Sequence, residues 1–362
     1  MGIFRSIEKG DHEQVVFCED ARSGLRAIIA IHSTALGPGL GGIRMRPYPS
    51  EQAALADALR LGEAMTKKAA VAGLALGGAK SVIFGDPRHD KTPERLRAFA
   101  RRVEALGGLY VGAEDMGIGA RDIDVMKGAT RWVVGGSTRN GGRGDPSPAT
   151  ARGVFEGIKV AVAEALGASD LKGVRIGVHG IGAVGCKLAR LLAGAGARLT
   201  LGDAEPAKAA CLAHELGAAW CAPDALLTED LDVFAPCSVG GVLTQSAVRA
   251  LRARVVAGAA NNPLASPAVG RALHRRAILY APDFVVNAGG LIHVGAEHYG
   301  EPAAETARRV LDVGCTLAEV FARAREWKMA PSDAAEEVAR RRLAFAGDAA
   351  QDVLEGMRVA AS

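Results

Sequence analysis

The stretch VRIGVHGIGAVG at residues 174–185 decides the fold class of this chain. Its apolar first half predicts a strand that runs into the pattern G-x-G-x-x-G, and residues 186–193 continue with helical spacing. Between a strand and a helix, these glycines permit a tight turn, a close approach of the backbone to a pyrophosphate and close packing of helix on strand. The positive end of the helix then favours the phosphates. The residues expected to hold a dinucleotide are Gly180, Gly182, Ala183, Val184 and Gly185.

An acidic residue follows the next predicted strand, 198–201. Asp203 lies 23 residues after Gly180, which matches the spacing of an acid that binds the ribose hydroxyls. Its charge should repel a 2′-phosphate, so the sequence favours NAD over NADP. Two later segments, 235–238 and 257–262, also follow predicted strands, at the edge where such sheets bind ligands. We expect them to contribute Pro236, Cys237, Ala259 and Asn261 to the nicotinamide end.

Length and composition predict a two-domain α/β protein with a tail. The chain has 362 residues, of which 49% are hydrophobic and 23% charged, as is usual for packed domains. A glycine-rich polar stretch at 135–146 marks the boundary, and strands alternate with helices from residue 171 onward. The expected domains are residues 1–145, a doubly wound Rossmann domain at 146–330, and a helical tail at 331–362 that packs back on the first domain.

Local signals predict elements around this boundary. We expect strands at 25–31 and 81–84, a glycine loop at 36–42, and a glycine turn from Leu74 that leads into the second strand. The expected helices run from Glu51 to Met65 with Ser50 as the cap, from a start at Thr92, with Pro93 at the first position, to a stop at Gly107, and from a cap at Ser147 to a stop at Gly167.

Charge and apolar runs exclude two kinds of partner. The net charge is +4, and the arginines at 340–342 follow glutamates at helical spacing, which predicts a solvated helix face and no nucleic-acid site. The longest run without charged, amide or hydroxyl residues, 69–79, is 11 residues long, whereas a membrane helix needs about 18. We expect no membrane partner.

Cysteine and histidine spacing argues against a metal site. No two of the six cysteines are two or three residues apart, so they predict free thiols in a reducing cytoplasm. The pair His293 and Glu297 lacks an evident third ligand.

Chemistry is concentrated in the first half, where the segments 65–68, 77–80 and 114–117 each carry lysine or acidic residues. A single lysine is more often a solvated surface charge. Lys80 differs because it precedes the apolar strand 82–84, where an unpaired ammonium group would be costly. We therefore expect a functional role for Lys80.

Seven segments together resemble the glutamate/leucine/phenylalanine/valine dehydrogenase family, and within it the leucine, valine and phenylalanine branch. They are the fingerprint at 180–185 and residues 41–45, 73–80, 113–115, 146–150, 235–237 and 287–290. The resemblance implies an NAD-dependent enzyme that converts an L-amino acid to the 2-oxo acid and ammonia. It also implies that residues 1–145 form the substrate-binding, catalytic and oligomerisation domain of a homo-oligomer, with the active site in the cleft between the domains.

By this resemblance, Lys68 binds the substrate carboxylate, Lys80 is the base that activates water, and Asp115 handles protons at the amino nitrogen. When a hydride has left Cα, water attacks the resulting iminium once a base has taken its proton. Lys80 must then be neutral part of the time. A nearby like charge such as Lys68 would lower the pKa of Lys80, which suits an alkaline optimum.

The resemblance extends to further contacts. It implies Thr150 and Asn287 as cofactor contacts beside Asn261, and Gly41, Met65 and Asn262 as substrate contacts. The side-chain pocket is expected to be lined by Leu40, Ala113, Leu291 and Val294. All four are apolar, so a glutamate side chain should be rejected. Leucine-type members usually carry Val at the position of Leu291, whereas phenylalanine-type members carry Leu there and Gly at the position of Ala113.

The predicted substrate is therefore an apolar L-amino acid of the leucine, valine and isoleucine class, with phenylalanine as a further candidate. Alternatives are an aromatic preference for phenylalanine or tryptophan, and a non-catalytic NAD-sensing homologue. A 2-hydroxy-acid dehydrogenase would need a histidine base beside an arginine clamp. The sequence departs from the branch pattern at Ile118, Gly119, Val134 and Asp145.

Overall fold

The computed structural model describes residues 10–361, and the side chains up to residue 346. The elements in chain order are β1 (Gln14–Asp20), β2 (Leu25–Ser33), β3 (Gly39–Arg46), α2 (Glu51–Val71), β4 (Gly77–Phe84), α3 (Pro93–Glu104), β5 (Tyr110–Glu114), α4 (Ala120–Lys127), η1 (Thr138–Asn140), α5 (Ser147–Leu166), β6 (Arg175–His179), α6 (Ala183–Gly194), β7 (Arg198–Gly202), α7 (Pro206–Leu216), β8 (Ala219–Cys221), η2 (Pro223–Leu227), β9 (Val233–Pro236), α8 (Gln245–Ala250), β10 (Val255–Val256), α9 (Pro267–Arg275), β11 (Leu279–Tyr280), α10 (Asp283–Val286), α11 (Gly289–His298), α12 (Ala303–Leu311), α13 (Val313–Trp327) and α14 (Pro331–Ala361).

Internal contacts divide the chain into two units, each with its own sheet. The first unit comprises the chain up to Asp145, together with His293–Pro302 and the chain from Ala339 onward. The second comprises Pro146–Ile292 and Ala303–Val338. This division differs from the expected domains in two places, because part of α11 groups with the first unit and the first residues of α14 group with the second.

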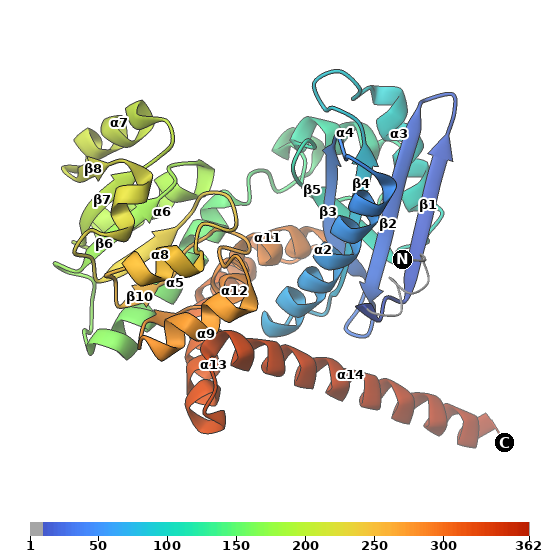
Figure 1. Ribbon diagram of the computed structural model, residues 1–362. Helices are drawn as coiled ribbons and strands as arrows, with labels where there is room; N and C mark the ends of the chain where they lie inside the picture. The colour runs from blue at the N-terminus through green and yellow to red at the C-terminus, as the bar shows by residue number, and fades with distance from the viewer. Residues whose placement is uncertain (1–9, 362) are drawn as a thin grey trace. The chain divides into compact units, whose positions relative to one another are not determined.

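The first unit is a five-stranded mixed sheet covered by helices on both faces (Figure 1). The strand order is β1-β2-β4-β3-β5, in which β3 runs parallel to β4 and β5 while β2 is antiparallel to both of its neighbours. On one face, Ala58 and Leu59 of α2 pack against Ile28 and Val82. On the other, α3 and α4 cover a core that contains Phe99. β4 therefore lies at the centre of the sheet.

Two glycine segments expected outside strands lie within them. The glycine loop at 36–42 is wrong in its second half, because β3 begins at Gly39. A Cβ on Gly41 would lie 1.7 Å from the carbonyl oxygen of Ala79, so these strands approach too closely for any side chain. β4 likewise begins at Gly77, four residues before the predicted strand. A Cβ on Gly78 would lie 2.0 Å from the amide nitrogen of Thr66, so glycine lets α2 sit directly on the sheet.

The predicted helix caps are confirmed at two of three starts. The hydroxyls of Ser50 and Thr92 accept the backbone N–H groups of Ala53 and Arg95. The cap at Ser147 is wrong, since Ser147 is already helical and Pro146 occupies the cap position. The stop at Gly167 is confirmed, because this residue has a left-handed φ of 68°. Helix α2 also runs beyond Met65, to Val71.

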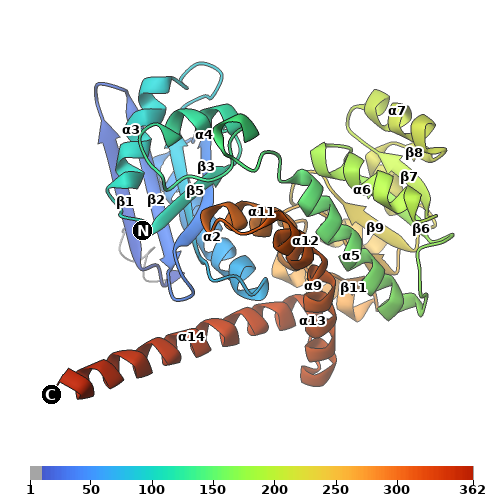
Figure 2. The same ribbon diagram turned by 180° about the vertical axis from the view of Figure 1, so that it is seen from behind.

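The second unit is a six-stranded parallel sheet in the order β11-β10-β9-β6-β7-β8. This order reverses direction between β6 and β9, as in a Rossmann fold, so the predicted doubly wound sheet is confirmed. Helices α5 and α6 lie on one face (Figure 2), and α8 and α9 lie on the other (Figure 1). On the second of these faces, Val248 of α8 and Leu273 of α9 belong to the same buried core as Phe234 of β9 and Tyr280 of β11.

The C-terminal helix contributes to the first unit through Arg342. Its guanidinium Nη1 donates to the carbonyl oxygens of Ala70, at 3.1 Å, and of Val71, at 2.5 Å. These carbonyls belong to the last turn of α2, where a positive charge stabilises a helix. The prediction of a solvated face for the arginine run is therefore wrong for Arg342, which closes the helix that carries Met65 and Lys68.

Candidate active site

Strand alternation places two cations on the face of the first sheet that α2 covers. Ile43 and Met45 of β3 belong to the opposite core, so Arg44 faces α2. Val82 of β4 packs toward α2, and Lys80, two residues before it, lies on the same face. Both side chains are therefore directed under a helix, where charge has to be paired.

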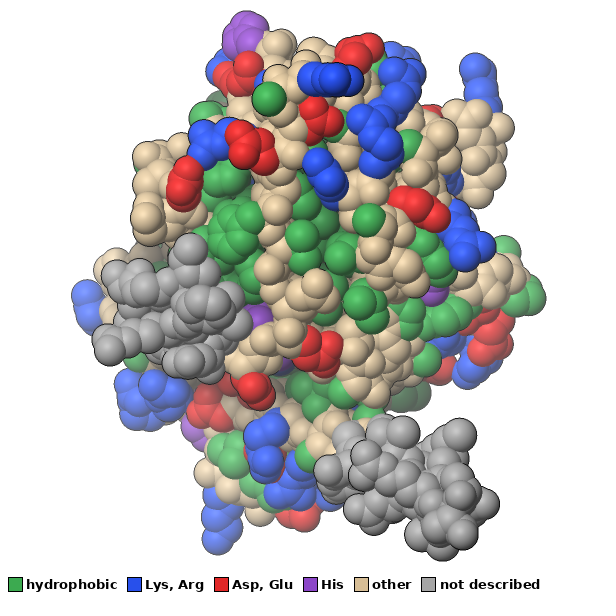
Figure 3. Space-filling model, turned by 90° about the vertical axis from the view of Figure 1, so that its right-hand side faces the viewer, with side chains coloured by type: hydrophobic (Ala, Val, Ile, Leu, Met, Phe, Trp, Pro, Cys, Tyr) green, Lys and Arg blue, Asp and Glu red, His purple; other side chains and the backbone are tan. Residues whose placement is uncertain are grey.

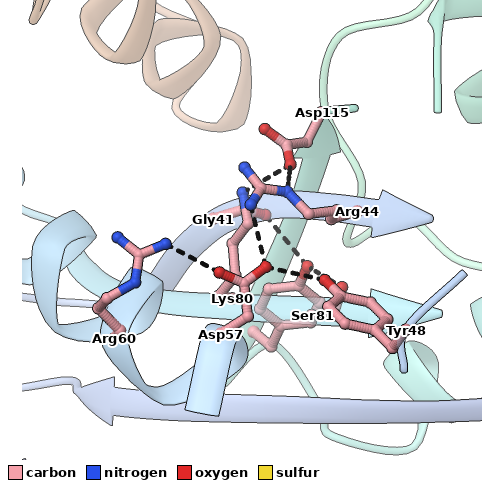
Figure 4. A network of polar contacts seen from close by, with 9 residues as sticks. Gly41, Arg44, Tyr48, Asp57, Arg60, Lys80, Ser81 and Asp115 are labelled. Carbon is pink, nitrogen blue, oxygen red and sulfur yellow. Dashed lines mark hydrogen bonds and ion pairs between the residues drawn. The ribbon is translucent and has the colours of Figure 1, made fainter. Parts of the chain in front are cut away.

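Lys80 is buried beside a carboxylate (Figure 4). It is 4% exposed, and its Nζ lies 3.1 Å from Oδ2 of Asp115. Asp115 follows β5 in a tight turn in which its backbone bonds reciprocally with Ile118. A Cβ on Gly42 would lie 2.8 Å from Nζ of Lys80 and 2.7 Å from Cβ of Asp115, so a glycine is needed to leave room for this pair.

The electrostatics of the pair favour a lysine that can lose its proton. Burial lowers the pKa of Lys80, the Asp115 carboxylate raises it, and the Arg44 guanidinium lowers it again. The net result is a pKa of Lys80 below the ordinary value for lysine. Burial would raise the pKa of Asp115, but the cations of Lys80 and Arg44 outweigh it and hold that pKa below its usual range. The expected direction for Lys80 is thus found, although burial and Arg44 are the main causes and not Lys68.

The other residues expected around the substrate lie on β3, β5 and α2 of the first unit and on α11, which the two units share. Leu40 and Ala113 are 1% and 6% exposed. Leu40 lies on β3, which pairs with β4, and Ala113 lies on β5, which pairs with the other edge of β3. Gly41 follows Leu40. Lys68 and Met65 lie in the last two turns of α2. Leu291 and Val294 lie about one turn apart on α11.

The glycine fingerprint has the local geometry that a dinucleotide needs. Gly180 has a φ of 102°, and a Cβ there would lie 2.7 Å from the amide nitrogen of Ser238. A Cβ on Gly185 would lie 2.0 Å from the carbonyl oxygen of Gly180, so this glycine packs the helix on the loop. Around Gly182, by contrast, no described atom lies within 4 Å of such a Cβ. The second glycine faces open space, and the fit to a pyrophosphate is good.

Helix α6 begins at Ala183, earlier than the predicted Cys186, so Ala183, Val184 and Gly185 form its first turn.

Asp203 follows β7, where its Oδ2 accepts the N–H of Ile181 at 2.6 Å and its Oδ1 accepts the N–H of Glu205 at 2.8 Å. Partial burial would raise the pKa of Asp203, but these N–H donors hold it below the usual value. An ionised acid therefore lies beside the fingerprint loop.

Three asparagines lie at the carboxyl ends of the second sheet. Asn287 is 3% exposed, and its amide Nδ2 donates to the carbonyl of Ala259 at 3.2 Å and to Oδ1 of Asn261 at 3.0 Å. Its own Oδ1 is buried and accepts no hydrogen bond from any described residue. Such an orphaned acceptor fits a donor from a ligand. Asn262 has a left-handed φ of 50°, and its N–H donates to Oδ2 of Asp283.

The remaining predicted cofactor residues surround this edge. Thr150 donates its hydroxyl to the carbonyl of Pro146, and a Cβ on Gly290 would lie 2.6 Å from that hydroxyl oxygen. Pro236 ends β9 and Cys237 follows it. Burial raises the pKa of Cys237 to about 12, so it remains a neutral thiol.

Sequence reasoning missed the polar groups behind the Lys80–Asp115 pair. They are Arg44, Tyr48 and Asp57 (Figure 4). The available signal was a charged residue between Ile43 and Met45 in an otherwise apolar segment. His179, whose Nδ1 lies 2.8 Å from the hydroxyl of Ser238 beside the fingerprint, was also missed.

Among the described residues no group of three or more His, Cys, Asp or Glu side chains could hold a metal ion. Glu297 instead pairs with Lys127 at 2.9 Å and accepts the backbone N–H groups of Gly135 and Arg143. In the same part of the chain no helix is long and apolar enough to cross a membrane.

Comparisons with known proteins agree with this architecture. The Glu/Leu/Phe/Val dehydrogenase dimerisation domain matches residues 12–132, and the Glutamate/Leucine/Phenylalanine/Valine dehydrogenase domain matches residues 204–309. Leucine dehydrogenase of Bacillus subtilis is 46% identical over 310 residues, which cover 86% of this chain and 85% of that protein. Valine dehydrogenase of Streptomyces virginiae is 45% identical over 342 residues, which cover 94% and 96%.

Solved structures show the same fold. L-tryptophan dehydrogenase from Nostoc punctiforme aligns with a TM-score of 0.85 at 37% identity, covering 96% of this chain and all of that one. A hetero-hexameric glutamate dehydrogenase from Thermus thermophilus aligns with a TM-score of 0.75 at 22% identity, covering 95% and 94%, which supports the fold alone.

A Rossmann sheet with a dinucleotide fingerprint, joined to a dimerisation domain, defines an NAD-dependent amino-acid dehydrogenase. The chain belongs to the glutamate/leucine/phenylalanine/valine dehydrogenase family, as its motifs predict.

Proposed function

We propose that this protein catalyses the reversible, NAD-dependent oxidative deamination of aliphatic L-amino acids, with leucine, valine and isoleucine as preferred substrates. The observation that carries the proposal is the buried Lys80, 3.1 Å from an ionised Asp115, in a sheet whose next two strands, β3 and β5, carry the apolar Leu40 and Ala113. A base and an acid are thereby available beside a surface suited to an aliphatic side chain.

Each of these groups has a defined task in the proposed reaction. Lys68 binds the substrate carboxylate as a point charge, which orients Cα. Lys80, in its neutral form, takes a proton from the water that attacks the iminium carbon. Asp115 receives or returns a proton at the substrate nitrogen and stays 3.1 Å from Lys80. Burial keeps bulk water away from Lys80 and Asp115, apart from the attacking water molecule, and strengthens the electrostatic interactions of both side chains.

The second unit holds the cofactor in this proposal. Bound NAD supplies the acceptor for the hydride that leaves Cα. The first turn of α6 binds the pyrophosphate and Asp203 the adenosine ribose. The buried Oδ1 of Asn287 accepts a donor at the nicotinamide end, where Thr150, Pro236, Cys237, Ala259 and Asn261 complete the contacts.

The substrate class can be tested with a panel of L-amino acids at alkaline pH, following NADH absorbance. We expect kcat/KM for leucine, valine and isoleucine to exceed kcat/KM for glutamate at least about 100-fold, because an apolar pocket wall leaves a carboxylate unpaired.

Ala113→Gly should raise kcat/KM for phenylalanine relative to leucine by up to about tenfold, since it removes one methyl group from the pocket wall. A wild-type preference for phenylalanine or tryptophan above tenfold would instead support the aromatic alternative.

Asp203→Ala should weaken NAD binding and lower the ratio of NAD to NADP efficiency at least about tenfold. The carboxylate is expected both to accept ribose hydroxyls, a charged hydrogen bond worth about 1.5–3 kcal/mol, and to repel a 2′-phosphate. The ratio of kcat/KM with the two coenzymes measures the effect. The exposed neighbour Glu205 offers a control, as Glu205→Ala should leave the ratio unchanged. An unchanged ratio in Asp203→Ala would assign coenzyme choice to another residue.

The proposed homo-oligomer is supported by the first unit. Residues 12–132 match a dimerisation domain, and β1, at the edge of the sheet, exposes 54% of Phe17. Hydrophobic side chains gather in the middle of the face in Figure 3, and charged side chains lie mostly around its margin. Sedimentation velocity would measure the subunit number, and a monomer at micromolar concentration would refute the proposed homo-oligomer.

The six free thiols support the proposed cytoplasmic location.

A further inference from the structure

Arg44 links the proposed acid to a second carboxylate on α2. Its Nε donates to Oδ2 of Asp115 at 2.7 Å, and its Nη1 donates to Oδ2 of Asp57 at 3.0 Å (Figure 4). Its side chain is 16% exposed, and the side chains of Asp57 and Asp115 are 15% and 24% exposed. One planar guanidinium thus fixes two partly buried carboxylates, a geometry that a single ammonium group cannot reproduce.

The far end of this arrangement is itself anchored. Asp57 accepts the hydroxyl of Tyr48 at 2.9 Å on the same Oδ2 and Nη2 of Arg60 at 2.8 Å on Oδ1. These donors hold the pKa of Asp57 below its usual value despite burial. Positive and negative charges therefore alternate along the series Lys80, Asp115, Arg44 and Asp57. Because Asp57 is itself held by Tyr48 and Arg60, Arg44 has little freedom to move away from Asp115.

Arg44 and Lys80 share one carboxylate oxygen, at 2.7 Å and 3.1 Å. The two cationic nitrogens therefore lie within about 6 Å of each other, a range at which like charges act strongly. An arginine stays protonated at any working pH. Lys80 is thus the member of the pair that has to give up its proton, while the Asp115 carboxylate remains ionised between them.

The charged groups around Lys80 come from three of the elements packed against it. β3 supplies Arg44, the turn after β5 supplies Asp115, and α2 supplies Asp57. On β2, the residue paired with Lys80 is the apolar Ala30. Further along α2, Glu63 and Lys67 pair with each other at 3.0 Å.

We propose that Arg44, clamped by Asp57, is a positioning residue of the reaction: it holds the Asp115 carboxylate in place and disfavours the ammonium form of Lys80. The inference rests on the proposed deamination, in which neutral Lys80 is the base. It assigns to Arg44 the electrostatic role that sequence reasoning gave to Lys68.

The test is the pH profile of kcat for leucine in Arg44→Met and Arg44→Lys. Loss of the Arg44 cation raises the pKa of Lys80, so the alkaline rise of kcat in Arg44→Met should move up by about one pH unit. At a pH below the rise, kcat should then fall about tenfold or more, while KM for leucine changes less than about threefold. Arg44→Lys keeps the charge, so its rise should stay within about 0.3 pH units of the wild type.

Two further variants separate this role from a structural one. Arg60→Met removes a cation that contacts Asp57 but not Asp115, and its profile should match the wild type. The double variant Arg44→Met/Asp57→Asn neutralises both members of the inner pair, and it gives the same readout if Arg44→Met alone does not fold. The inference is overturned if the rise stays within 0.3 pH units in these Arg44→Met proteins, or if Arg60→Met shifts it equally. A wild type that turns over no amino acid would refute the proposed function instead.

Discussion

Lys80→Ala should lower kcat for deamination by about 10² to 10⁴ and leave the affinity for NAD nearly unchanged. The size of this decrease in kcat follows from the loss of a proton-transfer group. Among the described residues, no other base lies beside Asp115 in the place of Lys80, whose Nζ is 3.1 Å from Oδ2 of Asp115. NAD affinity should persist because the fingerprint belongs to the other unit of the chain. Steady-state rates from NADH absorbance and calorimetric titration with NAD measure the two effects.

Lys67→Ala is the matched control for this change. Lys67 is one-third exposed and pairs with Glu63 on the same helix that carries Lys68, and we expect wild-type rates within about twofold. Near wild-type turnover in Lys80→Ala would remove Lys80 from the mechanism. Lost NAD affinity would show that the substitution disturbs more than the base.

Asp115→Asn should lower kcat by a similar factor, about 10² to 10³, and should also move the pH profile. The side chain keeps its shape but loses the charge that faces Lys80 and Arg44. Because the carboxylate raises the pKa of Lys80, its loss lowers that pKa further. The alkaline rise of the residual activity should therefore move to lower pH, opposite to the shift expected for Arg44→Met.

Asp122→Asn provides the comparison for this variant, since Asp122 pairs with Lys91 at 2.7 Å and does not contact Lys80. Its profile should coincide with the wild type. A rise that moves upward in Asp115→Asn, or does not move, would contradict the assigned electrostatics.

The parts of the fold that depend on neighbours in sequence could be predicted. The fingerprint turn, the caps at Ser50 and Thr92 and the stop at Gly167 all depend on residues within one or two turns. β3 could not be predicted, because Gly39–Gly42 has the composition of a loop. Its strand conformation depends on the close approach of Ala79 from β4, which only the folded sheet provides.

The candidate site shows the same limit. The roles proposed for Lys80 and Asp115 follow from motif resemblance, but the position of Arg44 beside both of them does not. Arg44 meets Asp115 across 71 residues of chain and Asp57 across 13, and no local pattern pairs them. Strand alternation could have placed Arg44 and Lys80 on one face, and this would have offered a second cation beside Lys68 as a cause for the lowered pKa of Lys80.

The role of Arg342 at the end of α2 has a consequence for the order in which the protein acquires structure during synthesis. All six strands of the second sheet lie in one continuous stretch, within Pro146–Ile292, so that sheet can form while the rest of the chain is still being made. The first unit is instead completed by His293–Pro302 and by the last helix. The helix that carries Lys68 therefore receives this cap only when translation has passed residue 342, so the sheet of the second unit can form before the first unit is complete.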